Sequence, residues 1–64
     1  MDCNRIAYYR TKHRLTQKAL GALVGVSDKT ISHYEIGYCK PTFEHLMKLT
    51  DVLKASVKAL FPNG

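Results

Sequence analysis

The stretch that decides the fold of this chain is Thr16–Gly37, TQKALGALVGVSDKTISHYEIG. Thr16 and Ser27 are good N-caps, and each precedes a run of residues with helical spacing. Gly25 interrupts the apolar pattern between the two runs, and Gly37 is suited to end the second run in a left-handed conformation. The stretch therefore predicts two short helices joined by a tight turn.

The second of these helices has two different faces, because successive residues are about 100° apart around a helix. Ile31, Tyr34 and Glu35 point away from the polar arc, on the face that is expected to pack. The opposite arc carries mostly short or polar side chains, namely Asp28, Lys29, Ser32, His33 and Ile36. Two helices joined by a short turn around a glycine form the geometry in which the second helix enters the DNA major groove.

Apolar spacing along the rest of the chain predicts three more helices, so that the fold is expected to be all-α and compact. A single domain over residues 1–64 is expected, with helices at residues 3–13, 17–24, 28–36, 43–53 and 57–61. Asp2 or Asn4 caps the first of these helices. Gly21 lies within the second, and its small size predicts close approach by the following helix.

The expected core contains the apolar residues on the inward face of each helix and of the connections. These are Ile6, Tyr9, Leu15, Leu20, Val24, Val26, Ile31, Tyr34, Phe43, Leu46, Leu49, Leu53, Val57 and Leu60.

The length and the net charge of the chain limit the classes of function that we expect for it. Sixty-four residues form a modest core and leave little room for a deep catalytic cleft. Ten Lys and Arg against five Asp and Glu give a net charge of +5, which favours nucleic acid, an anionic membrane or an acidic protein as partner. No stretch approaches the ~20 apolar residues of a membrane span, and residues 1–10 lack the apolar run of a signal peptide. A cytoplasmic protein is expected.

Neither an enzyme nor a metal protein is indicated. Cys3 and Cys39 lie far apart in the chain, so two reduced thiols are expected, with a disulfide as the alternative. Together with His13 and His45 they show no spacing typical of metal ligands. No nucleophile signature is present, and we expect no cofactor and no small-molecule ligand.

The run from Leu15 to Pro41, LTQKALGALVGVSDKTISHYEIGYCKP, resembles the Cro/cI-type (XRE) helix-turn-helix family of phage repressors and bacterial regulators. The most specific matches are Leu15-Thr16-Gln17, Gly25-Val26-Ser27, Thr30-Ile31-Ser32, Tyr34-Glu35, Gly37 and Pro41. The resemblance extends from about Asn4 to Phe61. It implies a five-helix, lambda-repressor-like domain that binds double-stranded DNA with its third helix in the major groove, as a transcriptional regulator.

The resemblance also implies roles for single residues. The base-reading positions are occupied by Asp28, Lys29, Ser32 and His33. The residues expected to contact backbone phosphates are Gln17, Thr30, Lys40 and Arg14. Arg10 and Glu35 match a partly buried ion pair between the first and third helices. Asp28 departs from the usual amide or basic residue, and it either caps the helix or accepts a hydrogen bond from cytosine N4.

One such domain reads only a few base pairs, so a homodimer on a palindromic operator is expected. The candidate dimer surface is formed by Val57, Leu60 and Phe61, and the alternative is that all three are buried in the monomer. Two other interpretations stay open. The chain is an antitoxin, a restriction-modification controller or a piece of a longer repressor, or it is a protein-interaction module that kept only the fold.

Overall fold

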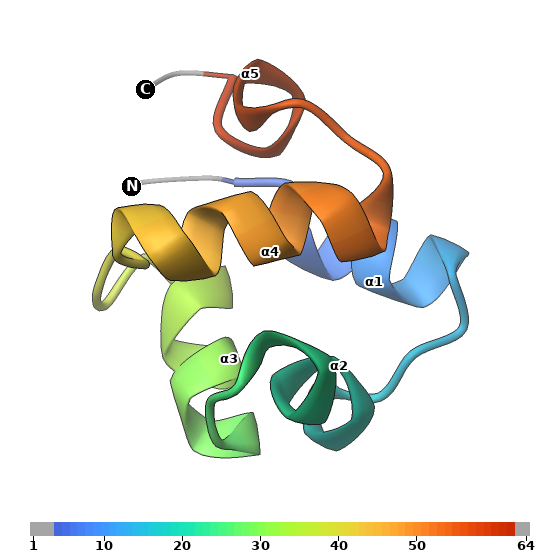
Figure 1. Ribbon diagram of the computed structural model, residues 1–64, viewed down its shortest axis with the longest axis vertical. Coiled ribbons are helices and arrows are strands. Elements are labelled where there is room, and N and C mark those ends of the chain that lie inside the picture. Colours follow the sequence, from blue (N-terminus) through green and yellow to red (C-terminus); the bar gives the residue numbers. More distant parts are fainter. Residues whose placement is uncertain (1–3, 63–64) are drawn as a thin grey trace.

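The computed structural model describes residues 4–62 and contains five helices, with no strand among these residues. In chain order they are α1 (Ile6–Lys12), α2 (Gln17–Val24), α3 (Asp28–Glu35), α4 (Phe43–Leu53) and α5 (Val57–Leu60) (Figure 1). The predicted all-α fold is confirmed. The largest difference between the predicted and observed helix bounds is at the start of α1, which is predicted at residue 3 and begins at Ile6. The predictions for Asp2 and Cys3 lie outside the described residues.

The start of each helix follows from its N-cap. Four helices are preceded by a serine or threonine whose hydroxyl accepts a hydrogen bond from a backbone N–H three residues later, at 3.0 to 3.3 Å; these are Thr16, Ser27, Thr42 and Ser56. In α1 the N-cap position is held by Arg5, and Asn4 accepts a bond from the N–H of Ile6 at 3.1 Å. Asn4 also donates to the carbonyl of Tyr34 at 2.7 Å, so it joins α1 to α3.

The turn between α2 and α3 is tight because of two glycines. Gly25 ends α2 with φ +95°, a left-handed conformation that glycine adopts without strain. A Cβ atom on Gly21 would lie 2.6 Å from the carbonyl oxygen of Val26. The predicted close approach at Gly21 is therefore present, but the turn makes it rather than the body of the following helix.

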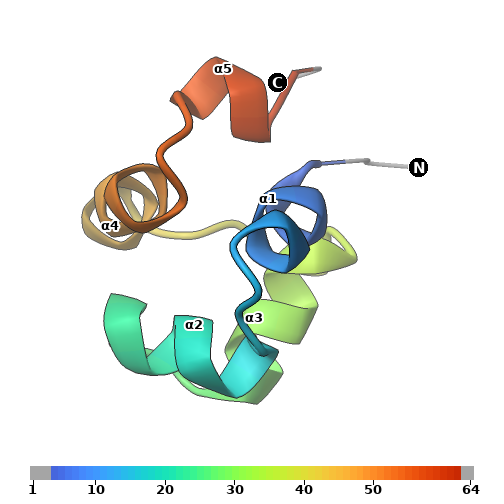
Figure 2. The same cartoon turned by 90° about the vertical axis from the view of Figure 1, so that its right-hand side faces the viewer.

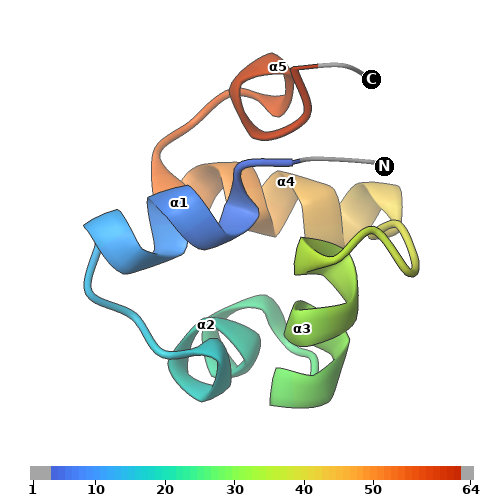
Figure 3. The same ribbon diagram turned by 180° about the vertical axis from the view of Figure 1, so that it is seen from behind.

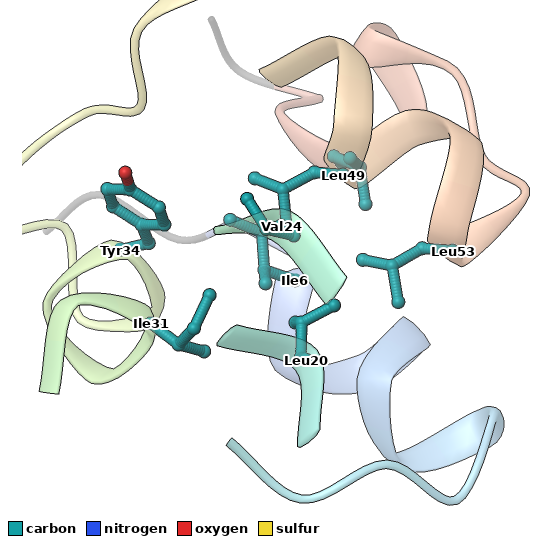
Figure 4. Packing of buried hydrophobic residues seen from close by; sticks show 8 residues of the cluster. Ile6, Leu20, Val24, Ile31, Tyr34, Leu49 and Leu53 are labelled. Atoms are coloured by element: carbon teal, nitrogen blue, oxygen red, sulfur yellow. The ribbon is translucent and has the colours of Figure 1, made fainter. Parts of the chain in front are cut away.

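Eight residues from all five helices form the buried core (Figure 4); they are Ile6, Leu20, Val24, Ile31, Tyr34, Leu49, Leu53 and Leu60. Tyr9, Leu15 and Val26 are partly buried and pack against this cluster. All eight are among the residues predicted for the core.

Two core predictions are wrong. Phe43 is 76% exposed and Val57 is 40% exposed. Each is the first residue of its helix, at an end that extends beyond the buried core. Helical periodicity indicates which face of a helix is apolar, but it does not show whether a residue near the end of that face is covered. In the four residues of α5 only Leu60 is fully buried.

The helices are arranged so that α2 and α3 form one end of the molecule and α5 the other, with α1 and α4 between them (Figures 2 and 3). The backbone N–H of Arg5 donates to the carbonyl of Leu60 at 2.8 Å, which holds α5 to the start of α1. None of the helices within residues 4–62 has the length and apolar character needed to cross a membrane.

Candidate nucleic-acid interface

The third helix packs one face and leaves the other accessible. Ile31 is fully buried and Tyr34 is 4% exposed. Burial raises the pKa of the Tyr34 phenol above its ordinary value of 10.0, and the charge of Cys39 adds to this rise. On the opposite face Asp28 and Lys29 are exposed, and the remaining two predicted base-reading residues, Ser32 and His33, are partly exposed. All four side chains thus lie on the outward side of α3.

At the start of α3, several polar groups are already bonded to one another. The hydroxyls of Ser27 and Thr30 lie 2.9 Å apart, and Thr30 is half-buried. One carboxylate oxygen of Asp28 accepts the backbone N–H of Lys29 at 2.8 Å. A carboxylate in the first turn is also stabilised by the helix dipole, by about 0.3 to 1 kcal/mol. Asp28 therefore helps to begin the helix, while Lys29 extends from it as an exposed cation.

A network of three side chains joins the first three helices. The Nε of Arg10 donates to Oε2 of Glu35 at 2.6 Å, and Nε2 of Gln17 donates to Oε1 of the same carboxylate at 2.9 Å. Arg10 also donates from Nη1 to the carbonyl of Leu15 at 2.8 Å. The side chains of Arg10 and Glu35 are only 16% and 9% exposed. The structure thus contains the expected ion pair and adds Gln17 to it.

This network has two consequences for the outward surface. Glu35 is neutralised by Arg10, so its carboxylate does not add a free negative charge near the α2–α3 pair. The amide of Gln17 is held in one orientation at the N-terminus of α2, where backbone N–H groups and the helix dipole favour an anion. The second amide hydrogen of Gln17 is left for another acceptor, because an amide nitrogen carries two donors.

The end of α3 is a Schellman motif. Gly37 has φ +79°, its N–H donates to the carbonyl of Tyr34 at 3.2 Å, and the N–H of Tyr38 donates to the carbonyl of His33 at 2.9 Å. This arrangement confirms the expected role of Gly37. It also turns Tyr38 back over the helix, where its ring lies 4.7 Å from the imidazole of His33, with 51° between the ring planes.

Sequence reasoning missed Tyr38, although a signal was available. A side-chain contact between the residue after the left-handed glycine and the residue five positions earlier commonly accompanies this motif. Given the predicted end at Gly37, those two residues are Tyr38 and His33.

Basic side chains flank the outward face of the α2–α3 pair. Arg14 is exposed and lies in the connection between α1 and α2, with φ +59°. Lys40 is exposed in the loop that follows α3. With the exposed Lys29, these residues place cations before, on and after the helix pair. A surface of this kind attracts a polyanion.

The candidate dimer surface requires one correction. Leu60 is fully buried in the monomer, so the prediction that it contacts a second copy is wrong. The reason is that α5 has a single turn and directs Leu60 into the core beside α4. Val57 is exposed and Phe61 is half-buried, and both line an open pocket of about 190 Å³ whose other walls are Lys40, Pro41 and Leu46.

The chain is similar to regulators of the helix-turn-helix type over nearly its whole length. A family model described as helix-turn-helix matches residues 6–60. An uncharacterized HTH-type transcriptional regulator from Methanocaldococcus jannaschii is 33% identical over 58 residues, which cover 91% of this chain and 88% of the relative. The crystal structure of the P22 c2 repressor protein in complex with synthetic operator 9T matches with a TM-score of 0.86 and 37% identity, covering 94% of this chain and 91% of that chain.

Proposed function

Because the chain belongs to the helix-turn-helix family of Cro/cI-type regulators, we propose that it is a repressor-like transcriptional regulator that binds a palindromic operator as a homodimer. Its family and fold are those of DNA-binding regulators. The P22 c2 repressor, which shares the fold at 37% identity, was crystallised with operator DNA.

The proposal rests on one observation: one face of α3 is buried in the domain while the opposite face is accessible. Its inner face is buried through Ile31 and Tyr34, and Glu35 at its end is bonded to both α1 and α2. A helix held this firmly keeps the backbone that carries its outer side chains in a fixed position. Direct reading of base edges in the major groove requires such rigid placement, because each contact is specific only within hydrogen-bond geometry.

We assign the base contacts to Asp28, Lys29, Ser32 and His33. Lys29, exposed on the first turn of α3, donates to guanine O6 and N7. Asp28 uses one oxygen for the N–H of Lys29, so the other is the one that would accept from cytosine N4. A good contact of this kind contributes about 1 to 3 kcal/mol of discrimination between base pairs.

We assign the phosphate contacts to the residues around the helix pair, namely Gln17, Thr30, Lys40 and Arg14. Gln17 is supported by its fixed amide at the start of α2, and Arg14 and Lys40 by their exposure and charge. Thr30 is half-buried, and its hydroxyl lies 2.9 Å from that of Ser27. It would bind a phosphate by donating its hydroxyl hydrogen while accepting the hydrogen of Ser27. Phosphate contacts set the position of the domain on the duplex but carry no sequence information.

A second copy of the chain is proposed to dock around Val57 and Phe61. These residues line an open pocket whose other walls are Lys40, Pro41 and Leu46, and the exposed ring of Phe43 belongs to the neighbouring helix. One domain spans only a few base pairs, whereas two domains related by two-fold symmetry read two half-sites. The palindrome and the dimer are therefore one proposal.

Selection of bound duplexes from a random DNA pool tests this proposal. We expect enrichment of a two-fold symmetric sequence with half-site centres about 10 base pairs apart, which is one helical turn. Lys29→Ala protein should enrich the same sequence with relaxed preference at one base pair in each half-site. Enrichment of a single asymmetric site would contradict the dimer, and no enrichment by the wild-type protein would contradict specific DNA binding.

A further inference from the structure

The contact between Tyr38 and His33 is not explained by the core. Tyr38 is 75% exposed, so little apolar surface is gained by its position over the imidazole. The ring is placed there by the backbone, because the N–H of Tyr38 is bonded to the carbonyl of His33 and Gly37 supplies the required left-handed residue. Tyr38 is thus fixed with respect to α3 although it lies outside the helix.

His33 depends on this neighbour for its orientation. It lies in the last turn of α3, where a partly exposed histidine has several accessible side-chain rotamers. The Tyr38 ring, with its centroid 4.7 Å from that of the imidazole, occupies space on one side of His33 and so reduces the number of rotamers open to it. Helical spacing places His33 on the same face of α3 as Lys29 and Ser32, so an imidazole with fewer rotamers is held closer to one orientation on that face.

We propose that Tyr38 is a positioning residue for DNA recognition, which fixes the imidazole of His33 for contact with a base edge. This inference rests on the proposed function, and it adds a residue that has no base-reading position of its own. Its consequence is specific: loss of the Tyr38 ring relaxes preference at the base pair that His33 reads and leaves preference at the other base pairs unchanged.

The chain offers a matched control in Tyr8. This residue is also an exposed tyrosine, 53% accessible, and its ring also packs on an aromatic neighbour, Tyr9, at 5.1 Å. It lies on α1, with Arg5 and Lys12 beside its ring. Tyr8→Ala therefore removes an equivalent side chain without removing the support of His33.

The experiment measures binding of the selected duplex, and of duplexes with each base pair of the half-site changed in turn, by fluorescence anisotropy. The variants are His33→Ala, Tyr38→Ala, Tyr38→Phe, Tyr8→Ala and the double variant His33→Ala/Tyr38→Ala, each first checked by its thermal unfolding. We expect Tyr38→Ala to reduce discrimination about three- to tenfold at the one base pair where His33→Ala reduces it, as partial loss of a single base contact. Tyr38→Phe should retain the wild-type preference, because it keeps the ring.

The outcomes separate this inference from the proposed function. If Tyr38→Ala weakens binding to all duplexes equally, or if Tyr8→Ala gives the same profile, Tyr38 does not act through His33 and the inference is wrong. A double variant with a further loss at that base pair beyond His33→Ala alone also contradicts it, since residues acting through one contact are not additive. If wild-type protein shows no preference at any base pair, the proposed function itself fails.

Discussion

Glu35→Ala is expected to lower the free energy of unfolding by about 3 to 5 kcal/mol. Glu35 is 9% exposed and accepts hydrogen bonds from both Arg10 and Gln17. Its removal leaves the guanidinium of Arg10, whose side chain is 16% exposed, without a counter-ion. The free energy lost by leaving this charge unpaired is larger than the net stabilisation that the ion pair provides. A chain of 64 residues has a total stability of about 3 to 10 kcal/mol. A wild-type stability in the lower half of this range would leave much of the variant unfolded at 25 °C. Urea denaturation followed by circular dichroism measures the loss.

The matched control is Asp51→Ala, which removes an exposed carboxylate from the last turn of α4. Its stability should stay within about 0.5 kcal/mol of the wild type, as is usual for surface substitutions. A double-mutant cycle with Arg10→Ala then isolates the pair, because the double variant should lose less stability than the sum of the two single losses. Equal urea midpoints for Glu35→Ala and the wild type would show that the network does not stabilise the fold.

Binding to duplex DNA is expected to weaken steeply with salt. Arg14 and Lys40 of two copies give four cationic phosphate contacts, and each contributes about −0.9 to the slope of log affinity against log salt. The combined slope of about −3.6 means that affinity falls about 150-fold when monovalent salt rises from about 50 to about 200 mM. Fluorescence anisotropy with the selected duplex and with a random duplex measures this, and both should show the dependence because phosphates are common to all sequences.

Charge-removal variants test which residues produce that slope. Lys40→Ala in both copies should reduce it to about −1.8, so that the same rise in salt lowers affinity only about tenfold. Lys58→Ala is the control, because it removes an exposed lysine from α5, which lies at the opposite end of the molecule from α2 (Figure 1). An unchanged slope for Lys40→Ala, or an equal reduction for Lys58→Ala, would remove Lys40 from the phosphate contacts.

The parts of the fold that depend on local chemistry were predictable from the sequence. Thr16 and Ser27 cap their helices as expected, and Gly37 ends α3 in the left-handed conformation. The division of α3 into a buried face with Ile31 and an open face with Lys29 follows from helical periodicity alone. These features are determined within a few residues of chain, so no tertiary information is needed.

The features that were missed depend on contacts between distant elements. The packing of α5 directs Leu60 inward and leaves Val57 outside, and a four-residue helix has too few positions for a periodic pattern to show this. The bond from Gln17 to Glu35 joins residues 18 positions apart, and it depends on the angle between α2 and α3. The family resemblance supplied the partner of Arg10 but not the third member of the network.

The central claim is that the outward face of α3 lies against base pairs, and an NMR titration with duplex DNA at low ionic strength tests it most directly. With the selected operator, we expect the largest changes in backbone amide signals at Asp28, Lys29, Ser32 and His33, with smaller changes at the N-terminus of α2 and in the loop after α3. The outer face of α1, around Tyr8, should be unaffected. The account is contradicted if the signals of α3 stay in place while the DNA binds elsewhere on the molecule.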